Sequence, residues 1–143
     1  MSTDPVRPYR PADRDQVVAL WQACDLTRPW NDPDADIGRA LETPTSTLLV
    51  HAAEPGRVTG TLMVGYDGHR GWMYYLASDP AARGGGIARA LVQRAEEFLR
   101  AQGCPKVELM VRGTNAAALG FYDRLGYEAQ DVVVRAKWLS GGT

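Results

Sequence analysis

The stretch Arg83-Gly84-Gly85-Gly86-Ile87-Ala88 carries most of the information about the fold. It follows Asp79-Pro80, where a strand-like run stops, and it precedes a long amphipathic segment. Glycine adopts backbone angles that other residues avoid, and a helix that begins after such a turn exposes unpaired N–H groups and the positive end of its dipole. Such a turn binds phosphate, and Arg83 and Arg89 add positive charge. We therefore expect a phosphate-bearing ligand at a helix start.

The residues before this turn read as strands. Three runs rich in Val, Leu and Tyr are separated by the turn signals Pro55-Gly56 and Asp67-Gly68, a pattern that predicts an antiparallel meander. The predicted strands span 47–53, 58–66 and 72–78. Ahead of them the sequence predicts a strand at 6–9, then a helix for which Asp13 is the N-cap, with Gln16 three places on. A second short helix with Ile37 and Leu41 is expected to end before Pro44.

The residues after the turn alternate between helix and strand. One apolar stripe, ended by Gly103, predicts a helix through Ile87, Ala88, Leu91, Ala95, Phe98 and Leu99. A buried strand is expected at 107–111, then a helix that Asn115 caps and Gly126 ends, then a last strand at 131–138. The order of elements predicts a mixed α/β (α+β) domain, with one domain spanning residues 1–143.

Composition limits the classes of partner. The 143 residues include 16 Lys and Arg against 17 Asp and Glu, so no general affinity for nucleic acid or for a membrane surface is expected. The sequence has no signal-peptide core or membrane-spanning run, and a cytoplasmic location is the default. Cys24 and Cys104 are expected to be thiols, and with two histidines in the chain no metal site is predicted.

The glycine turn fits three alternative roles less well. Three glycines before a helix can be a flexible connection and nothing more. A dinucleotide-binding turn, G-x-G-x-x-G, would need glycine where Arg89 stands and an acid about twenty residues further on, where Gln102, Gly103 and Cys104 stand. A phosphate-binding P-loop would need Gly-Lys-Ser/Thr, which does not follow. The flanking arginines and the position at a helix start favour a different phosphate ligand.

Two motifs, in the expected order, resemble the GNAT superfamily of N-acetyltransferases. The superfamily's acyl-CoA signature, Gln/Arg-x-x-Gly-x-Gly/Ala, stands here as Arg83-x-x-Gly86-x-Ala88. A second pattern stands as Asn115, Phe121-Tyr122 and Gly126-Tyr127. The segments 28–33, 66–71 and 103–106 are further similar to the bacterial YpeA-like acetyltransferases. The resemblance implies a V-shaped mixed sheet of six to seven strands, flanked by about four helices, in which the strand ending near Ser78 splays from the 107–111 strand.

The resemblance also implies a cofactor site. Acetyl-CoA would lie in the slot between the splayed strands, and coenzyme A would be the product. The implied binding residues are Leu76, Ala77 and Ser78 through their backbone, Arg83, Gly84, Gly85, Gly86, Ile87, Ala88 and Arg89 at the pyrophosphate, and Asn115 near the thioester.

Acyl transfer to an amine needs a neutral nucleophile and a proton for the departing thiolate. Tyr122 matches the family's general-acid tyrosine and is the predicted proton donor, although its spacing also fits a core aromatic. Some relatives carry a glutamate as base at the position of Met110, which cannot accept a proton. Glu108, two residues earlier on the same strand face, is the candidate base, directly or through water, and a surface carboxylate is the alternative.

The acceptor is expected to be an amine of a small molecule or of a protein or peptide. Candidate acceptor-binding residues are Trp30, Asn31, Asp32, Asp67 and His69, with Arg70 beside them, although each could instead pack or build a turn. Two functions remain: an acetyl-CoA-dependent N-acetyltransferase, or a non-catalytic acyl-CoA-binding regulatory module. A monomer and a homodimer are both compatible with the sequence.

Overall fold

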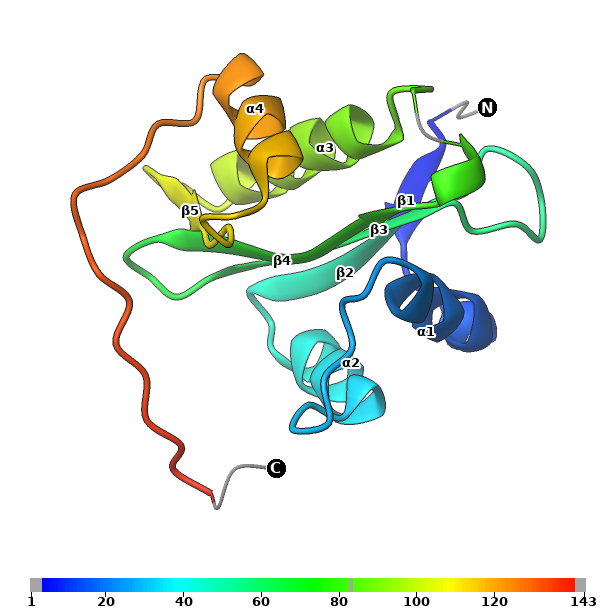
Figure 1. Ribbon diagram of the computed structural model, residues 1–143. Helices are drawn as coiled ribbons and strands as arrows, with labels where there is room; N and C mark the ends of the chain where they lie inside the picture. The colour runs from blue at the N-terminus through cyan, green and yellow to red at the C-terminus, as the bar shows by residue number, and fades with distance from the viewer. Residues whose placement is uncertain (1–3, 83, 141–143) are drawn as a thin grey trace.

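The protein is described by a computed structural model that covers residues 4–82 and 84–140. These residues form a five-stranded sheet with helices on both faces, as Figure 1 shows. Helices α1 and α2 cover one face, and helices α3 and α4 lie on the other. The predicted mixed α/β architecture is confirmed.

The sheet has the strand order β1-β2-β3-β4-β5. Its first four strands pair antiparallel, which confirms the predicted meander. The fifth strand pairs parallel to β4, because α3 carries the chain back across the sheet before β5 begins. The strands are β1 (Val6–Pro8), β2 (Ser46–His51), β3 (Gly60–Tyr66), β4 (Gly71–Ser78) and β5 (Val107–Leu109).

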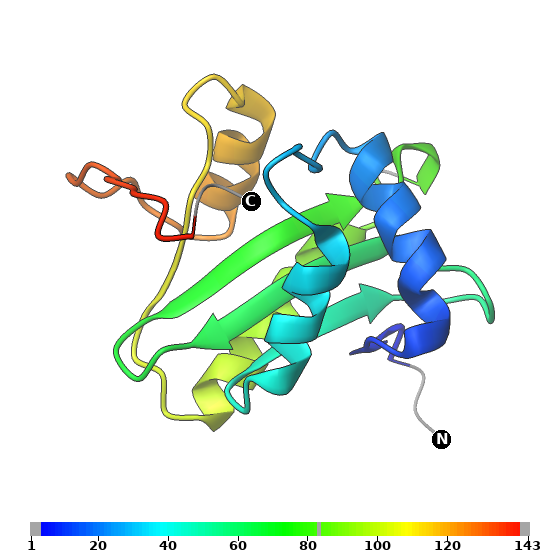
Figure 2. The same cartoon turned by 90° about the horizontal axis from the view of Figure 1, so that it is seen from below.

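Helices α1 (Arg14–Ala23) and α2 (Pro33–Glu42) run across one face of the sheet, as the view in Figure 2 shows. Trp21 and Ile37 are buried between these helices and the sheet. Asp13 takes the predicted N-cap position of α1, but its carboxylate does not cap the helix, because it accepts from Nη1 and Nη2 of Arg7 at 2.8 and 2.9 Å. This ion pair fixes β1 to the start of α1.

Helices α3 (Ile87–Ala101) and α4 (Ala116–Arg124) lie on the opposite face. Two glycines let α3 approach the strands closely: a Cβ at Gly60 would lie 2.5 Å from Ile87 Cγ2, and one at Gly71 would lie 2.7 Å from Leu99 Cδ1. The first turn of α3 is therefore fixed over β3. In the described part of the chain, no helix is long and apolar enough to cross a membrane.

The C-terminal segment differs from the sequence prediction. The sequence predicts a last strand at 131–138, but these residues adopt no strand and leave the body as an extended tail (Figure 1). The described sheet therefore has five strands rather than six to seven. Strand β5 is also shorter than predicted, ending at Leu109 instead of 111. A strand requires a second strand to pair with, and residues 131–138 pair with none within the described chain; the backbone bond from Val132 N to the Gln130 carbonyl is local.

Candidate active site

Strands β4 and β5 pair at their beginning and then separate. Gly71 to Met73 pair with β5, whereas β4 continues to Ser78. Leu76, Ala77 and Ser78 thus lie where the strands have parted, with a backbone edge available to a ligand. The splay expected between these strands is present.

A β-bulge shapes β4 at the separation. Thr61 pairs with Ala77 and Met63 with Tyr74, so β4 has one extra residue there. Tyr75 takes a left-handed backbone angle, φ 55°, which is unusual for a residue with a side chain. The Thr61 hydroxyl donates to the Tyr75 carbonyl at 2.8 Å and holds the bulge in place.

The glycine turn lies at the start of α3, beside the end of β4. Gly84 and Gly86 have φ values of 91° and 79°, in the region that glycine favours, and Gly84 to Gly86 are exposed. Gly86 has no side chain to cap the helix, so the first N–H groups of α3 are open to an anion. Ile87 is buried, Ala88 is half-buried and Arg89 is exposed, while Arg83 lies outside the described residues.

Tyr122 is buried on the inner face of α4. Its ring contacts Phe121 and Tyr127 edge to face, with centroids 5.0 and 5.4 Å away. Burial raises the pKa of Tyr122 to about 12, so its hydroxyl keeps its proton at neutral pH. Asn115 caps the same helix, as predicted: its side-chain oxygen accepts from Ala118 N at 3.1 Å.

Glu108 lies on the paired part of β5. It stands opposite Trp72, before the strands separate, and its carboxylate lies 3.3 Å from Arg70 Nε. Glu108 and Tyr122 both line a groove of about 630 Å³ along the free edge of β5. Met110, which follows β5, is exposed and cannot act as a base.

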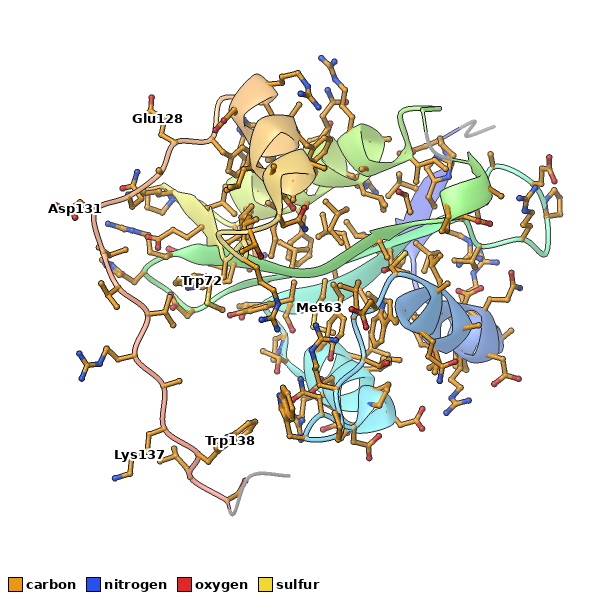
Figure 3. The ribbon with its side chains drawn as sticks, viewed as in Figure 1. Met63, Trp72, Glu128, Asp131, Lys137 and Trp138 are labelled. Atoms are coloured by element: carbon orange, nitrogen blue, oxygen red, sulfur yellow. The ribbon has the colours of Figure 1, made fainter. Side chains whose placement is uncertain are left out.

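A second hollow, of about 650 Å³, lies on the α1 and α2 side of the sheet. Trp30 and Asn31 line it, as do Met63 from β3, labelled in Figure 3, and Arg112 from the segment after β5. Since Tyr74 also lines it, this hollow reaches the place where β4 and β5 separate. We call it the acceptor-side pocket.

Three other predicted acceptor residues are not among the residues that line this pocket. Asp32 caps α2, accepting from Asp34 N at 3.0 Å. Asp67 builds the β3–β4 turn, where its carboxylate accepts from the backbone N–H groups of His69 and Arg70, each at 2.8 Å. The turn places His69 on the exposed surface.

The pocket contains charged residues that the sequence does not single out. Asp36 accepts from the Tyr75 hydroxyl at 2.6 Å and from Arg39 at 2.7 Å. Burial and the bond to Asp36 raise the pKa of Tyr75. Arg28 and Arg112 also line the pocket, so it holds three cations and one carboxylate. These residues come from distant segments, so spacing in the sequence carries no signal of their meeting. No cluster of three metal-ligating side chains occurs within residues 4–82 and 84–140.

Comparisons with known proteins agree with this geometry. The profile of the Acetyltransferase (GNAT) family matches residues 15–127. The protein named acetyltransferase SG1711, from Sodalis glossinidius, is 51% identical over 129 residues, which cover 90% of each chain.

Two solved structures are similar in fold at lower identity. An acetyltransferase from Trypanosoma brucei is 24% identical with a TM-score of 0.73, covering 93% of this chain and 98% of that one. AAC(6')-Iy, in complex with the bisubstrate analogue CoA-S-monomethyl-acetylneamine, is 14% identical with a TM-score of 0.79, covering 94% of this chain and 97% of that one.

Proposed function

Since the chain belongs to the acetyltransferase (GNAT) family and is an acyltransferase, we propose that it moves an acetyl group from acetyl-CoA directly to an amine. One observation carries this proposal: β4 and β5 separate beside the open start of α3. A gap next to an anion-binding helix start suits a ligand with a linear arm and a pyrophosphate.

The donor would be bound mainly by backbone groups. Leu76 to Ser78 would bond the amides of the pantetheine arm along the free edge of β4. Gly84 to Gly86 and the first N–H groups of α3 would hold the pyrophosphate, and Arg89 and Arg83, which precedes the glycines in the sequence, would add positive charge. Asn115 would lie near the thioester. The exposed turn supports this assignment, because no described side chain fills the space where Cβ atoms of Gly84 and Gly86 would point.

Tyr122 would act as the general acid. Attack of the neutral amine on the thioester carbonyl forms the C–N bond and breaks the C–S bond, and the departing thiolate takes the Tyr122 proton. The amine nitrogen loses one proton in the same reaction, which restores the tyrosine. The raised pKa supports this role, because a tyrosine that stays protonated can donate.

The arginines favour a particular class of acceptor. Three guanidinium groups and one carboxylate line the acceptor-side pocket, an excess of positive charge. Nearby cations lower the pKa of a bound amine, which favours the neutral nucleophile. They also repel a purely cationic acceptor, and an acid group on the acceptor would offset that repulsion. We therefore propose an amine that also carries a carboxylate or phosphate.

The same charges reduce the demand on a general base. An acceptor amine with a lowered pKa could lose its proton to water. Glu108 remains the candidate side chain for the general base. Its ion pair with Arg70 holds the carboxylate where β4 and β5 are still paired. A Glu108→Gln variant that keeps full kcat at all pH values would remove it from this role.

The test is release of free thiol from acetyl-CoA with matched pairs of amines, one member of each carrying an acid group. We expect turnover, a lower KM for the acidic member, and a smaller difference between the members in Arg112→Gln. Tyr122→Phe should lower kcat by about 100-fold or more with little change in the Kd of acetyl-CoA. Tyr66→Phe is the control, because the Tyr66 hydroxyl donates to the Gly68 carbonyl within the β3–β4 turn.

Two results would contradict the proposal. Tight acetyl-CoA binding without turnover on any amine would favour a non-catalytic acyl-CoA-binding module. Equal kcat values for Tyr122→Phe and the Tyr66→Phe control would exclude Tyr122 as the acid.

A further inference from the structure

Two of the three arginines that line the acceptor-side pocket already have partners in the chain. Arg39 donates to the Asp36 carboxylate at 2.7 Å. Arg28 Nη1 donates to the carbonyls of Asp25 and Thr27, each at 2.8 Å, and lies 3.5 Å from the Asp25 carboxylate. The charge of each of these two arginines is therefore offset by one nearby carboxylate.

Arg112, the third arginine, differs from the other two. It is exposed, and its guanidinium makes no hydrogen bond or ion pair with residues 4–82 and 84–140. One positive charge and a planar fork of N–H donors are therefore available to a ligand. This fork matches the two oxygens of a carboxylate, which carries one negative charge, whereas a phosphate ester carries about two. The pocket thus fits a carboxylate better than a phosphate.

The position of Arg112 in the fold brings such a carboxylate close to the reacting amine. The Asn115 N–H donates to the Arg112 carbonyl at 2.9 Å, so both residues belong to one turn at the start of α4. The proposed function places Asn115 near the thioester. A carboxylate bound by Arg112 and an amine that attacks this thioester are therefore neighbours, as they are in an α-amino acid, where one carbon carries both groups.

Two aromatic side chains of the pocket have much of their surface in water. Trp30, which precedes α2, is 45% exposed, and Tyr74 on β4 is 44% exposed. Leu26 and Met63, both half-buried, add further apolar surface to the lining. Covering apolar surface with a ligand is favourable, and aromatic rings also stack on one another. The pocket therefore suits a ligand with a large apolar or aromatic group.

The pocket gives little support to a purely cationic acceptor. Asp36 is the one carboxylate among the described residues that line it, and it already accepts from the Tyr75 hydroxyl and from Arg39. An ammonium group would therefore find no free counter-charge there. The volume of about 650 Å³ lies within the range of pockets that bind small molecules. Size and charge together favour a small acceptor with a negative group.

We propose that the acceptor is a free α-amino acid with a large apolar or aromatic side chain, an inference that rests on the proposed acetyl transfer. Arg112 binds the carboxylate, and Trp30 and Tyr74 enclose the side chain. The amine forms the C–N bond as the C–S bond of the thioester breaks, and the proton that the amine loses replaces the one that Tyr122 gives to the thiolate. The products are the N-acetyl amino acid and coenzyme A.

The carboxylate contact is tested by free-thiol release with phenylalanine and phenylalaninamide. Because the two amines differ in pKa, the measured quantity is the ratio of their kcat/KM values in each variant. This ratio should fall by roughly 10-fold or more in Arg112→Gln. Arg112→Lys keeps the charge without the fork and should recover part of it. Arg94→Gln removes an exposed arginine of α3 that lines neither pocket, and should keep the wild-type ratio.

The side-chain contact is tested with phenylalanine and alanine. We expect kcat/KM to be roughly 10-fold or more higher for phenylalanine, because its ring covers apolar surface of the pocket. Trp30→Ala should remove most of this preference. Leu41→Ala is the matched control, because Leu41 is also 45% exposed but does not line the pocket, and it should keep the preference. Circular dichroism should show the wild-type fold in each variant.

The amino-acid assignment and the proposed acetyl transfer fail on different results. Faster turnover of phosphoethanolamine than of phenylalanine, or an unchanged ratio in Arg112→Gln, would overturn the assignment and leave acetyl transfer in place. Absence of turnover on any amine would contradict acetyl transfer. Calorimetry of phenylalanine with the coenzyme A-loaded protein then decides the assignment separately: binding that Arg112→Gln weakens supports it, and no binding, or equal binding in both proteins, overturns it.

Discussion

Replacing Thr61 by valine is expected to destabilise the fold and to impair the acceptor-side pocket. Thr61 is fully buried, and its hydroxyl accepts from Trp21 Nε1 at 2.9 Å while donating to the Tyr75 carbonyl at 2.8 Å. It thus joins α1, β3 and the bulge of β4. Tyr75 stacks on Trp21 with centroids 3.9 Å apart and bonds Asp36. One hydroxyl therefore supports a chain of contacts that ends in the pocket.

The size of the effect follows from the two lost partners. Valine has nearly the same shape as threonine, so no cavity forms, but an indole N–H and a backbone carbonyl stay buried without a bond. Each such group costs about 1–3 kcal/mol, which gives about 2–6 kcal/mol in total. That loss corresponds to a melting temperature lower by roughly 5–20 °C. Because Tyr75 lines the pocket, the KM for the acceptor should also rise.

Urea unfolding followed by circular dichroism measures the loss for Thr61→Val. Thr47→Val, a half-buried threonine on β2, is the matched control and should change the free energy of unfolding by less than about 1 kcal/mol. If Thr61→Val lost no more than this control, the two bonds would not support the bulge and the reasoning would fail.

Two further predictions concern the cofactor turn and pH. Gly86→Val should weaken acetyl-CoA binding by at least about tenfold in calorimetry, because a β-branched residue is strained at φ 79° and blocks the approach of the pyrophosphate. Gly56→Val, at φ 77° in a distant turn, carries the same strain and should leave the affinity unchanged; equal affinities in both variants would refute the site. His51 is buried against Thr59, and burial lowers its pKa. As the pH falls below about 6.5, the unfolded chain takes up a proton that the folded chain resists, so the free energy of unfolding should fall. Urea titrations of His51→Gln should lose this part of the pH dependence, and an unchanged slope would contradict it.

Local patterns predict most of the elements. The apolar stripe of α3, the cap at Asn115 and the meander before the glycine turn all depend on neighbours within a few residues, and each is confirmed. The prediction fails where a side chain has a stronger distant partner. Asp13 stands at the N-cap of α1 as predicted, but its side chain binds Arg7 across the β1–α1 connection and makes no capping bond.

The acceptor-side pocket leaves little signal in the sequence. Trp30 and Asn31 are predicted near it and line it, but Asp36, Tyr75 and Arg112 meet there because α2, the β4 bulge and the segment after β5 converge. The packing of separate elements brings these side chains together, so the sequence contains no periodic pattern that predicts their contact.

Local backbone and side-chain chemistry is enough to specify the glycine turn, the helix that follows it and the strand-like composition of 131–138. The packed fold adds two facts that no local pattern contains: β4 and β5 separate beside the turn, and the tail finds no partner strand within the described chain. Strand pairing joins residues far apart in sequence or in different molecules, so it is set by which edges remain open after the rest has folded.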